Sequence, residues 1–220
     1  MCVVSAAVRS VNAAPLGRVR GLARPSGIQK RPVDRIEVRD PGPKRVGLGS
    51  GVVGDAIGNK KFHGGESQAV YAFAREELDW WERELGRELP DGAAFGENVT
   101  TTGLEVDDAL VGERWRVGTA LLEVCRPRTP CATFAAHMGE LRWMKRFAAR
   151  ERVGAYLAVV EAGVIEPGDP IEVVERPDHD VTVPMLFRAV MGDRDLGRHI
   201  LDAEALRPSE HEWLAGRFGR

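Results

Sequence analysis

One short stretch of the sequence brings a cysteine, two arginines and two prolines close together. Cys131 follows a loop that contains Pro127 and Pro130, and Arg126 and Arg128 stand just before it. Proline fixes φ and lacks an N–H donor, so the chain must leave any sheet between the two prolines. The residues after Cys131 are typical of a helix, which would place its thiol at the first turn, beside unpaired N–H groups.

This environment favours ionisation of the Cys131 thiol. Neighbouring arginines and helix N–H groups lower a thiol pKa, and the thiolate is the form that attacks an electrophile or binds a metal. Arg126 and Arg128 could hold a phosphate group through paired hydrogen bonds. A soft thiolate beside an anion clamp suits a cofactor that carries both a soft metal and a phosphate. The alternative is a buried cysteine in a rigid loop with surface arginines, because free cysteine is among the most buried residue types.

A second candidate region places a histidine immediately before two glycines. Gly64 and Gly65 would let the backbone approach a ligand closely, with His63 beside it. A lone histidine next to a turn is more often structural unless other pocket residues converge on it. Farther along the chain, Asn98 fits either a ligand-binding position or a turn.

Basic residues are concentrated between residues 18 and 31, a segment that ends at Lys30 and Arg31. Either a solvated face of a sheet or an anion pocket would produce this pattern, and the solvated face is the commoner explanation. The nearby match to GxGxxG, at residues 49–54, is not a dinucleotide-binding fingerprint. No helix begins directly after it, and a further glycine interrupts the segment that follows.

The composition is that of a soluble globular protein. The 220 residues are 43% hydrophobic and 29% charged, which is enough for one well-buried core and a small appendage. The 31 Lys and Arg residues nearly balance the 33 Asp and Glu residues, so the chain lacks the overall basic field of a nucleic-acid-binding protein. Three cysteines, Cys2, Cys125 and Cys131, are too few for a disulfide scaffold and indicate a reducing compartment. No apolar run approaches the roughly 18 residues of a membrane helix and no basic leader is present, so we expect a cytoplasmic protein without a membrane partner.

Alternating apolar and polar residues predict mainly β structure. We expect strands near residues 1–11, 35–39, 69–73, 95–103, 113–117, 121–125, 156–160 and 171–173. Two similar glycine–acid turns, each followed by an alternating strand, imply an antiparallel or mixed barrel-like sheet. Helical spacing predicts helices over residues 76–85 and 140–150, the second with Leu141, Met144 and Phe147 or Ala148 inward. Three short helices are expected at 184–191, 196–201 and 209–218, the last opened by a capping box of Ser209 and Glu212.

Eight short motifs occur in an order and spacing that indicate a family: Ser26–Val33, Gly54–Asp55, His63–Gly65, Ala69–Tyr71, Phe95–Thr100, Gly103–Leu104, Pro127–Arg128 and Pro130–Cys131. Together they resemble the MOSC family, the domain found at the C-terminus of molybdenum cofactor sulfurases, and in particular its stand-alone bacterial branch. The resemblance covers nearly the whole chain. It implies a mainly β fold, with a MOSC-type β-barrel and peripheral helices over residues 1–176, followed by a three-helix module over residues 181–220.

The resemblance also implies a site. The barrel would hold a molybdenum cofactor, a molybdopterin, with Cys131 as the catalytic residue and the ligand to molybdenum. The expected cofactor contacts are Lys30, Arg31, His63, Gly64, Gly65, Asn98, Arg126 and Arg128. The family pattern differs in two places: Cys125 stands where a threonine or similar residue is expected, and Arg126 adds a charge beside the loop.

Relatives with this resemblance reduce N-hydroxylated compounds, including hydroxylaminopurine base analogues, so a small N–OH molecule is the expected substrate. The chain shows no flavin or nicotinamide motif and no cysteine set for an iron–sulfur cluster. We therefore expect electrons from a separate reductase of the flavoprotein or ferredoxin type. We expect no nucleic-acid partner.

Three alternatives remain open at the level of the sequence. The protein could be a carrier, in which Cys131 bears a persulfide or holds the cofactor for delivery. A zinc site built from Cys125, Cys131 and His137 is disfavoured, because no paired CxxC spacing supports it. The three-helix module either covers the pocket or mediates a homodimer.

Overall fold

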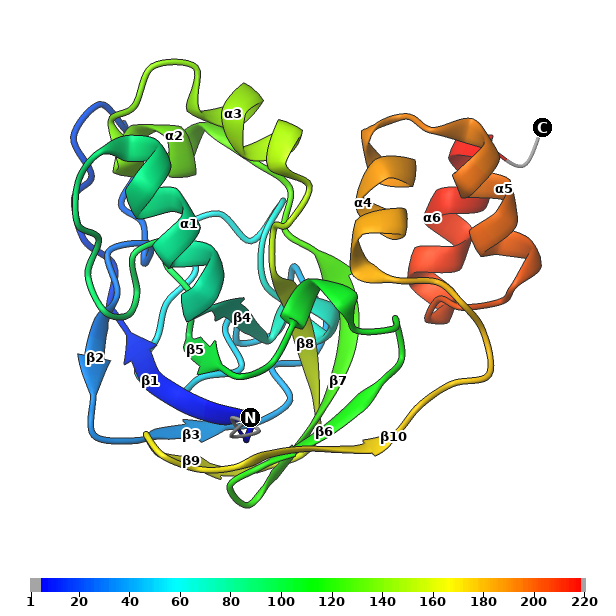
Figure 1. Cartoon of the computed structure of the whole chain (residues 1–220), viewed down its shortest axis with the longest axis horizontal. Helices are drawn as coiled ribbons and strands as arrows, with labels where there is room; N and C mark the ends of the chain where they lie inside the picture. The colour runs from blue at the N-terminus through cyan, green and yellow to red at the C-terminus, as the bar shows by residue number, and fades with distance from the viewer. Residues whose placement is uncertain (1–4, 219–220) are drawn as a thin grey trace.

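The computed structural model describes residues 5–218, and its strands form a curved sheet below two groups of helices (Figure 1). Within these residues the main sheet has eight strands in the order β10-β6-β7-β8-β4-β5-β1-β2, and β3 pairs with β9 in a separate ladder. The strands are β1 (Ala7–Ala13), β2 (Arg31–Val33), β3 (Ile36–Val38), β4 (Val70–Ala74), β5 (Val99–Thr102), β6 (Arg114–Val117), β7 (Ala120–Pro127), β8 (Ala155–Glu161), β9 (Gly163–Ile165) and β10 (Ile171–Glu175).

The sheet is mixed and bends back on itself. Most neighbours run antiparallel, but β4 and β5 are parallel, and helix α1 (Arg75–Leu85) provides the crossover that a parallel pair needs. The N–H of Val8 donates to Asp169 O at 2.9 Å, which brings the segment before β10 against β1. The predicted mixed sheet with peripheral helices is confirmed. The edge strands β10 and β2 do not pair within residues 5–218, so a closed barrel stays a prediction.

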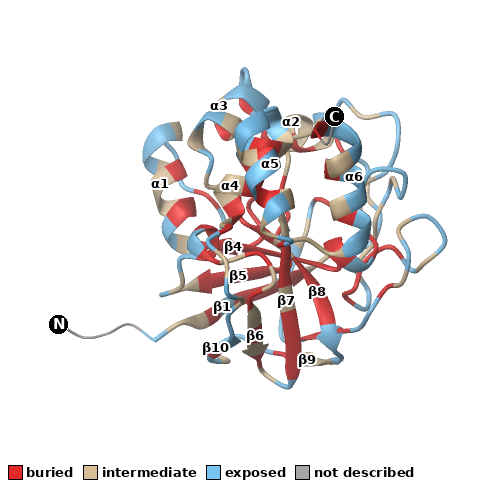
Figure 2. Ribbon diagram, turned by 90° about the vertical axis from the view of Figure 1, so that its right-hand side faces the viewer, coloured by how far each residue is buried: buried red, intermediate tan, exposed pale blue. Residues whose placement is uncertain are grey.

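Aliphatic side chains fill the inner face of the sheet, as the buried strands of Figure 2 show. Val70, Val99, Leu122, Val124 and Leu157 are each at most 2% exposed. Burying a side chain of this size stabilises the fold by about 1.5–3 kcal/mol relative to leaving it in water. These strands therefore form a rigid support for the loops that begin at their ends.

A second core, made of aromatic side chains, joins α1 to the helices α2 (Ala132–Met138) and α3 (Trp143–Arg150). Trp81, Phe95, Phe134, Trp143 and Phe147 are each at most 1% exposed. The rings of Phe134 and Phe147 meet edge to face at 4.9 Å between centroids. Such pairs contribute about 0.5–1.5 kcal/mol beyond the area that they bury. The cluster fixes α2, and with it the residue at the start of that helix.

The prediction for α3 was wrong in its start and in its inward face. The helix begins at Trp143 rather than at residue 140, because Arg142 adopts a left-handed conformation with φ of 56°. Trp143 and Phe147 therefore point inward, four residues apart. Leu141 is 82% exposed and Met144 is 45% exposed, so neither packs as predicted.

Three further boundaries differ from the predictions. The strand expected over residues 95–103 begins only at Val99, because the Glu97 carboxylate accepts the N–H of Phe95 at 2.9 Å and closes a turn there. The first strand begins at Ala7, and residues 1–4 of the predicted strand lie outside the described residues, as does Cys2. The last helix begins at Pro208, so Ser209 lies inside the helix rather than at its cap.

The three predicted C-terminal helices are confirmed as α4 (Val183–Met191), α5 (Arg194–Asp202) and α6 (Pro208–Phe218), which stand apart from α1–α3 in Figure 1. They share a small core that includes Leu186, Ile200 and Leu214. Thr182 and Asp193 cap α4 and α5 through their side-chain oxygens. The division of the chain into domains at residues 176 and 181 stays a prediction. No helix in the described part of the chain is long and apolar enough to span a membrane.

The buried position of Cys125 on β7 gives a test of the packing. Its side chain is 2% exposed, and burial raises the pKa of the thiol to about 12. Cys125→Ser places a more polar hydroxyl at this buried position, so we expect the free energy of unfolding in urea to fall by about 1 kcal/mol or more. The cofactor content should be unchanged. Loss of cofactor without loss of stability would instead place Cys125 in the site.

Candidate functional site

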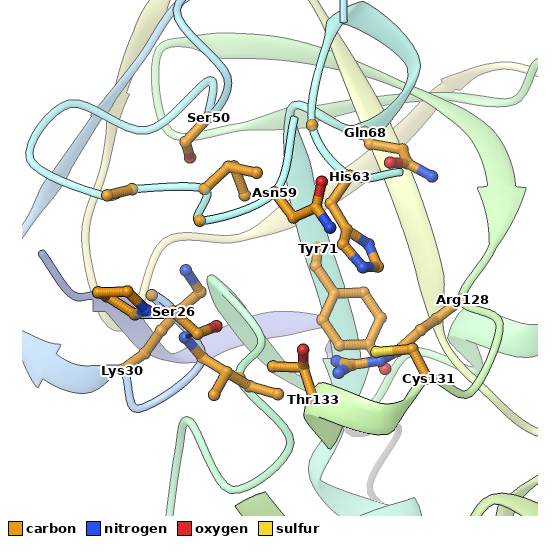
Figure 3. Close-up of a pocket in the computed structure, with 18 of the residues that line it drawn as sticks. Ser26, Lys30, Ser50, Asn59, His63, Gln68, Tyr71, Arg128, Cys131 and Thr133 are labelled. Carbon is orange, nitrogen blue, oxygen red and sulfur yellow. Dashed lines mark hydrogen bonds between the residues drawn. The ribbon is translucent and has the colours of Figure 1, made fainter. Parts of the chain in front are cut away.

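The described residues enclose a cavity of about 330 Å³, a volume in the range of small-molecule sites. Its walls come from residues 22–30, residues 50–69, strand β4 and the start of α2 (Figure 3). Loops therefore supply most of the wall, while β4 and α2 supply the fixed part. The rejected GxGxxG stretch is a loop rather than a turn into a helix, and it contributes Ser50 to the wall.

Cys131 lies in this cavity at the N-cap of α2, so the predicted placement before a helix is confirmed. Burial raises the pKa of its thiol, but a hydrogen bond from His63, the charge of Arg128 and the N–H of Phe134 outweigh burial and lower the pKa to about 7. These surroundings therefore favour the thiolate form of Cys131 near neutral pH. The predicted thiolate environment is confirmed, although its main cause is His63 rather than Arg126.

Arg128 is a buried cation that faces the same cavity. It is 5% exposed, its guanidinium donates to Phe95 O, and it lies over the rings of Tyr71 at 4.7 Å and Phe134 at 4.0 Å. Among residues 5–218 no carboxylate lies within 4.0 Å of it. A buried charge without an ionic partner is strongly unfavourable, and a bound anion would relieve it. The position of this side chain thus fits the anion-binding role predicted for it.

Lys30 also lines the cavity, but its ammonium group is already paired. It forms an ion pair with Asp55, and the two side chains are 6% and 1% exposed. Burial lowers the pKa of Lys30 in spite of the attraction of the carboxylate. Asp55 accepts further hydrogen bonds from Ser50 Oγ at 2.7 Å and from the N–H of Ala14 at 3.1 Å. The carboxylate therefore ties three segments of the wall together.

Asn98 lines the cavity as a structural junction. Its Nδ2 donates to Asp55 Oδ2 and to Asn12 O, both at 3.2 Å, and its Oδ1 accepts the N–H of Tyr71 at 3.2 Å. All three of these partners belong to the protein. The side chain therefore holds the start of β5 and of β4 in register with the Asp55 network.

The two glycines after His63 are required by the backbone. Gly64 has φ of +79°, and a Cβ there would lie 2.5 Å from Gly49 O. Gly65 has φ of +85°, and a Cβ there would lie 2.6 Å from the Cα of Lys44. His63 and Gly64 line the cavity, and the imidazole of His63 lies above Cys131 in Figure 3. Gly65 shapes the turn from outside the wall.

Two predicted cofactor contacts lie elsewhere. Arg31, on β2, lines a separate hollow together with Arg87. Arg126 points towards α6, where its Nη1 lies 3.7 Å from Glu210 Oε1. Strand β7 ends at Pro127, so the alternation of side chains along the strand does not extend to Arg128.

The zinc alternative finds no support in the described residues. His137 Nε2 lies 3.1 Å from Ala94 O, and Cys125 is buried on β7. No group of three His, Cys, Asp or Glu side chains within residues 5–218 is arranged to hold a metal ion.

Sequence reasoning missed several polar residues of the wall. Gln68 is 8% exposed, and its Oε1 has no hydrogen-bond partner among the described residues. Tyr71 and Tyr156 were read only as strand residues. Asp55 carried a signal, since it belongs to the Gly54–Asp55 motif, but nothing near it in the sequence indicated that it pairs with Lys30.

Residues 59–172 match the family model described as the MOSC domain, which is a little more than half of the chain. The chain belongs to the MOSC domain family. It is 35% identical over 135 residues to the protein YiiM of Escherichia coli (strain K12), an alignment that covers 60% of each chain. It is 34% identical over 131 residues to a protein named "Reductase" of Gibberella moniliformis (strain M3125 / FGSC 7600), over 58% of this chain and 23% of that protein.

A solved structure extends the similarity to nearly the whole fold. YiiM from Geobacillus stearothermophilus superposes with a TM-score of 0.74 at 28% identity, over 97% of this chain and 99% of that one. The sequence alignments themselves span less than two thirds of the curated relatives, at 60% of the Escherichia coli protein and 23% of the Gibberella protein.

The ion pair between Lys30 and Asp55 predicts a pH-dependent loss of stability. Asp55→Asn leaves a buried ammonium group unpaired, so we expect the free energy of unfolding at pH 7 to fall by about 3 kcal/mol or more. Burial already lowers the pKa of Lys30. The unfolded chain therefore holds this proton more tightly than the folded protein does, and the charged form of Lys30 destabilises the fold below the ordinary lysine pKa of about 10.4. The loss should therefore shrink as the pH rises towards 10.

Asp195→Asn is the matched control, because the Asp195 side chain is 96% exposed. Its stability should change by less than about 0.5 kcal/mol. Equal stability of the Asp55 variant and wild type in urea at pH 7 would contradict the central role of this carboxylate.

The pKa of Cys131 predicts its reactivity. The rate at which iodoacetamide alkylates Cys131 should rise with pH, with a midpoint at about pH 7. Mass spectrometry of the peptide that contains Cys131 measures this rate. His63→Ala removes the hydrogen bond that stabilises the thiolate, so the midpoint should rise. His199→Ala is the control, because His199 lies in α5 and pairs with Asp180. This variant should leave the midpoint unchanged. A wild-type midpoint at the ordinary thiol value of about 8.5 would contradict this account.

Proposed function

We propose that the protein is an oxidoreductase that binds the molybdenum cofactor and reduces small N-hydroxylated compounds, such as hydroxylaminopurine base analogues. The observation that carries the proposal is the meeting of a thiolate and a buried cation in one cavity, where no carboxylate of the described residues pairs with the cation. Cys131, with a pKa of about 7, and the buried guanidinium of Arg128 both line it. The MOSC domain is the type found in cofactor sulfurases, and one relative carries the name "Reductase".

The residues present fit such a cofactor. A thiolate is a soft ligand of the kind that suits a soft metal, and Cys131 supplies it. Arg128 would bind the phosphate group, because an anion would balance a charge that the described residues leave unpaired. The orphaned Oε1 of Gln68 offers an acceptor to the N–H groups of a pterin ring. His63 would hold the sulfur of Cys131 in its ionised form.

The overall reaction consumes two electrons and two protons: R–NHOH + 2 e⁻ + 2 H⁺ → R–NH₂ + H₂O. The bound cofactor would supply the two-electron oxygen-transfer chemistry, while the protein binds and orients it. The His63 hydrogen bond keeps Cys131 deprotonated and therefore able to remain a ligand. The stacked rings of Tyr71 and Phe134 exclude water from the Arg128 side of the cavity.

The proposal includes the finer organisation of the chain. Residues 1–176 would form a β-barrel, which the contact between Val8 and Asp169 supports, and residues 181–220 would form a module with its own core. We further propose a cytoplasmic protein that receives electrons from a separate flavoprotein or ferredoxin-type reductase. The module would cover the cavity side of β7 or form a homodimer contact.

A carrier function is the second candidate. A thiolate with a pKa of about 7 can also bear a persulfide or hold a cofactor for delivery. Catalysis distinguishes the two functions, because a carrier would not oxidise a reduced donor when substrate is added.

Cofactor content tests the proposal directly. Wild type and Cys131→Ala, both purified from a host that makes the cofactor, should differ in molybdenum and pterin per chain. We expect near-stoichiometric content in wild type and a loss of at least tenfold in the variant, with Cys125→Ala as the control that keeps its content. The loaded wild type should then reduce hydroxylaminopurine with reduced methyl viologen as the electron source.

Two results would contradict the proposal. A well-folded wild type that carries neither molybdenum nor pterin would exclude the cofactor function, and Cys131 would then be tested as a sulfur carrier. Turnover at full rate with NADH alone would contradict the requirement for a separate reductase.

A further inference from the structure

The charge of the chain is divided unevenly along its length. Residues 1–61 contain 12 Lys and Arg residues against 4 Asp and Glu residues, whereas the rest of the chain contains 19 against 29. The near balance of the whole sequence therefore hides a strongly basic part. That part includes most of the loops that form the cavity wall.

Two loops of this basic part are joined to each other, and residues 39–48 and 58–63 of these loops are here called the rim surface. Lys60 Nζ donates to Gly47 O at 2.9 Å, and the N–H of Gly65 donates to Gly49 O at 2.9 Å, so the two loops are held together. The rim surface exposes four cations and three large apolar side chains: Arg39, Arg45, Lys60, Lys61, Val46, Leu48 and Phe62. The only carboxylate within the two loops, that of Asp40, accepts the N–H of Gly42 at 2.8 Å.

The rim surface is continuous with the wall of the cavity. Asn59 and His63 line the cavity, and Lys60, Lys61 and Phe62 lie between them in the sequence with their side chains exposed. The imidazole of His63 lies beside Cys131 in Figure 3 and contributes to the lowered pKa of its thiol. The side chain of His63 therefore lies between a molecule bound on the rim surface and Cys131.

The apolar residues indicate a protein rather than a small anion as the occupant. Val46, Leu48 and Phe62 are 85%, 55% and 59% exposed on these two joined loops, and exposed apolar surface bordered by charged residues marks interaction sites. Protein interfaces combine an apolar centre with a polar rim, and complementary charge steers the encounter of the partners. The complement of this surface is an acidic protein with an exposed apolar centre.

We propose that the rim surface docks an acidic protein electron donor at the mouth of the cavity. The proposal rests on the proposed function, which requires two electrons per N–OH reduced and a separate protein to supply them. The donor is oxidised by two electrons in this exchange, and solvent supplies the two protons that complete the amine and water.

Charge reversal tests the docking. The cofactor-loaded double variant Arg45→Glu/Lys61→Glu is compared with Lys145→Glu/Arg217→Glu, which makes the same change of charge at exposed sites on α3 and α6. The donor is an acidic flavodoxin kept reduced by its NADPH-dependent reductase, and hydroxylaminopurine is the substrate. We expect kcat/KM for flavodoxin to fall at least tenfold in the rim variant and to stay unchanged in the control. The wild-type value should also fall as salt is added.

A small reductant separates docking from chemistry. Reduced methyl viologen needs no docking surface, so its rate should be equal in wild type, the rim variant and the control. Phe62→Ser tests the apolar part, and we expect it to raise KM for flavodoxin without changing the viologen rate. The proposed function fails if viologen drives no turnover in the loaded wild type.

The docking proposal fails separately if viologen drives turnover and either of two results is found. One is an equal flavodoxin kcat/KM in wild type and rim variant. The other is turnover with neither flavodoxin nor an acidic [2Fe–2S] ferredoxin. Binding of a fluorescent single-stranded oligonucleotide that the rim variant loses, without any effect on donor-driven turnover, would assign the surface to nucleic acid and overturn the proposal.

Discussion

The shape of the cavity depends on one buried carboxylate, that of Asp55. It pairs with Lys30 and accepts hydrogen bonds from Ser50, Asn98 and the backbone of Ala14, groups that come from well-separated parts of the sequence. In a low-dielectric interior a fully satisfied polar network is rigid, and a partly satisfied one is costly. Loops that carry little regular secondary structure therefore form walls of defined shape.

This arrangement also sets the charge of the cavity. Lys30 and Asp55 neutralise each other, which leaves Arg128 and the Cys131 thiolate as the groups that interact with a ligand. Burial opposes the thiolate, but the Arg128 charge and the His63 hydrogen bond stabilise it. The two charges are thus mutually dependent, because each supports the ionised state of the other. A ligand that brings both an electrophilic metal and an anionic group satisfies both.

Local patterns predicted most helices, the position of Cys131 and all strands except β2 and β9, because proline spacing and hydrophobic periodicity depend on nearby residues. They could not distinguish Arg126 from Arg128, which stand two residues apart and look equivalent in the sequence. The two arginines differ because Arg126 lies within β7, beside Glu210 of α6, whereas Arg128 lies beyond the end of the strand at Pro127. The role of Asp55 was likewise hidden, since its partners are distant along the chain. Tertiary contacts of this kind leave no periodic signal.

The first strand of the sheet takes several of its partners from later parts of the chain. The C-terminal end of β1 pairs with β2 soon after both are made, but β5 pairs along its other edge and residues 168–171 bond to its N-terminal end. Part of each edge therefore stays unpaired until these later segments are available. Closing such long loops is opposed by chain entropy before native contacts form, which slows folding. Unpaired strand edges are also templates for association between chains. Until β5 and residues 168–171 are made, the unpaired edges of β1 are therefore open to pairing with another chain.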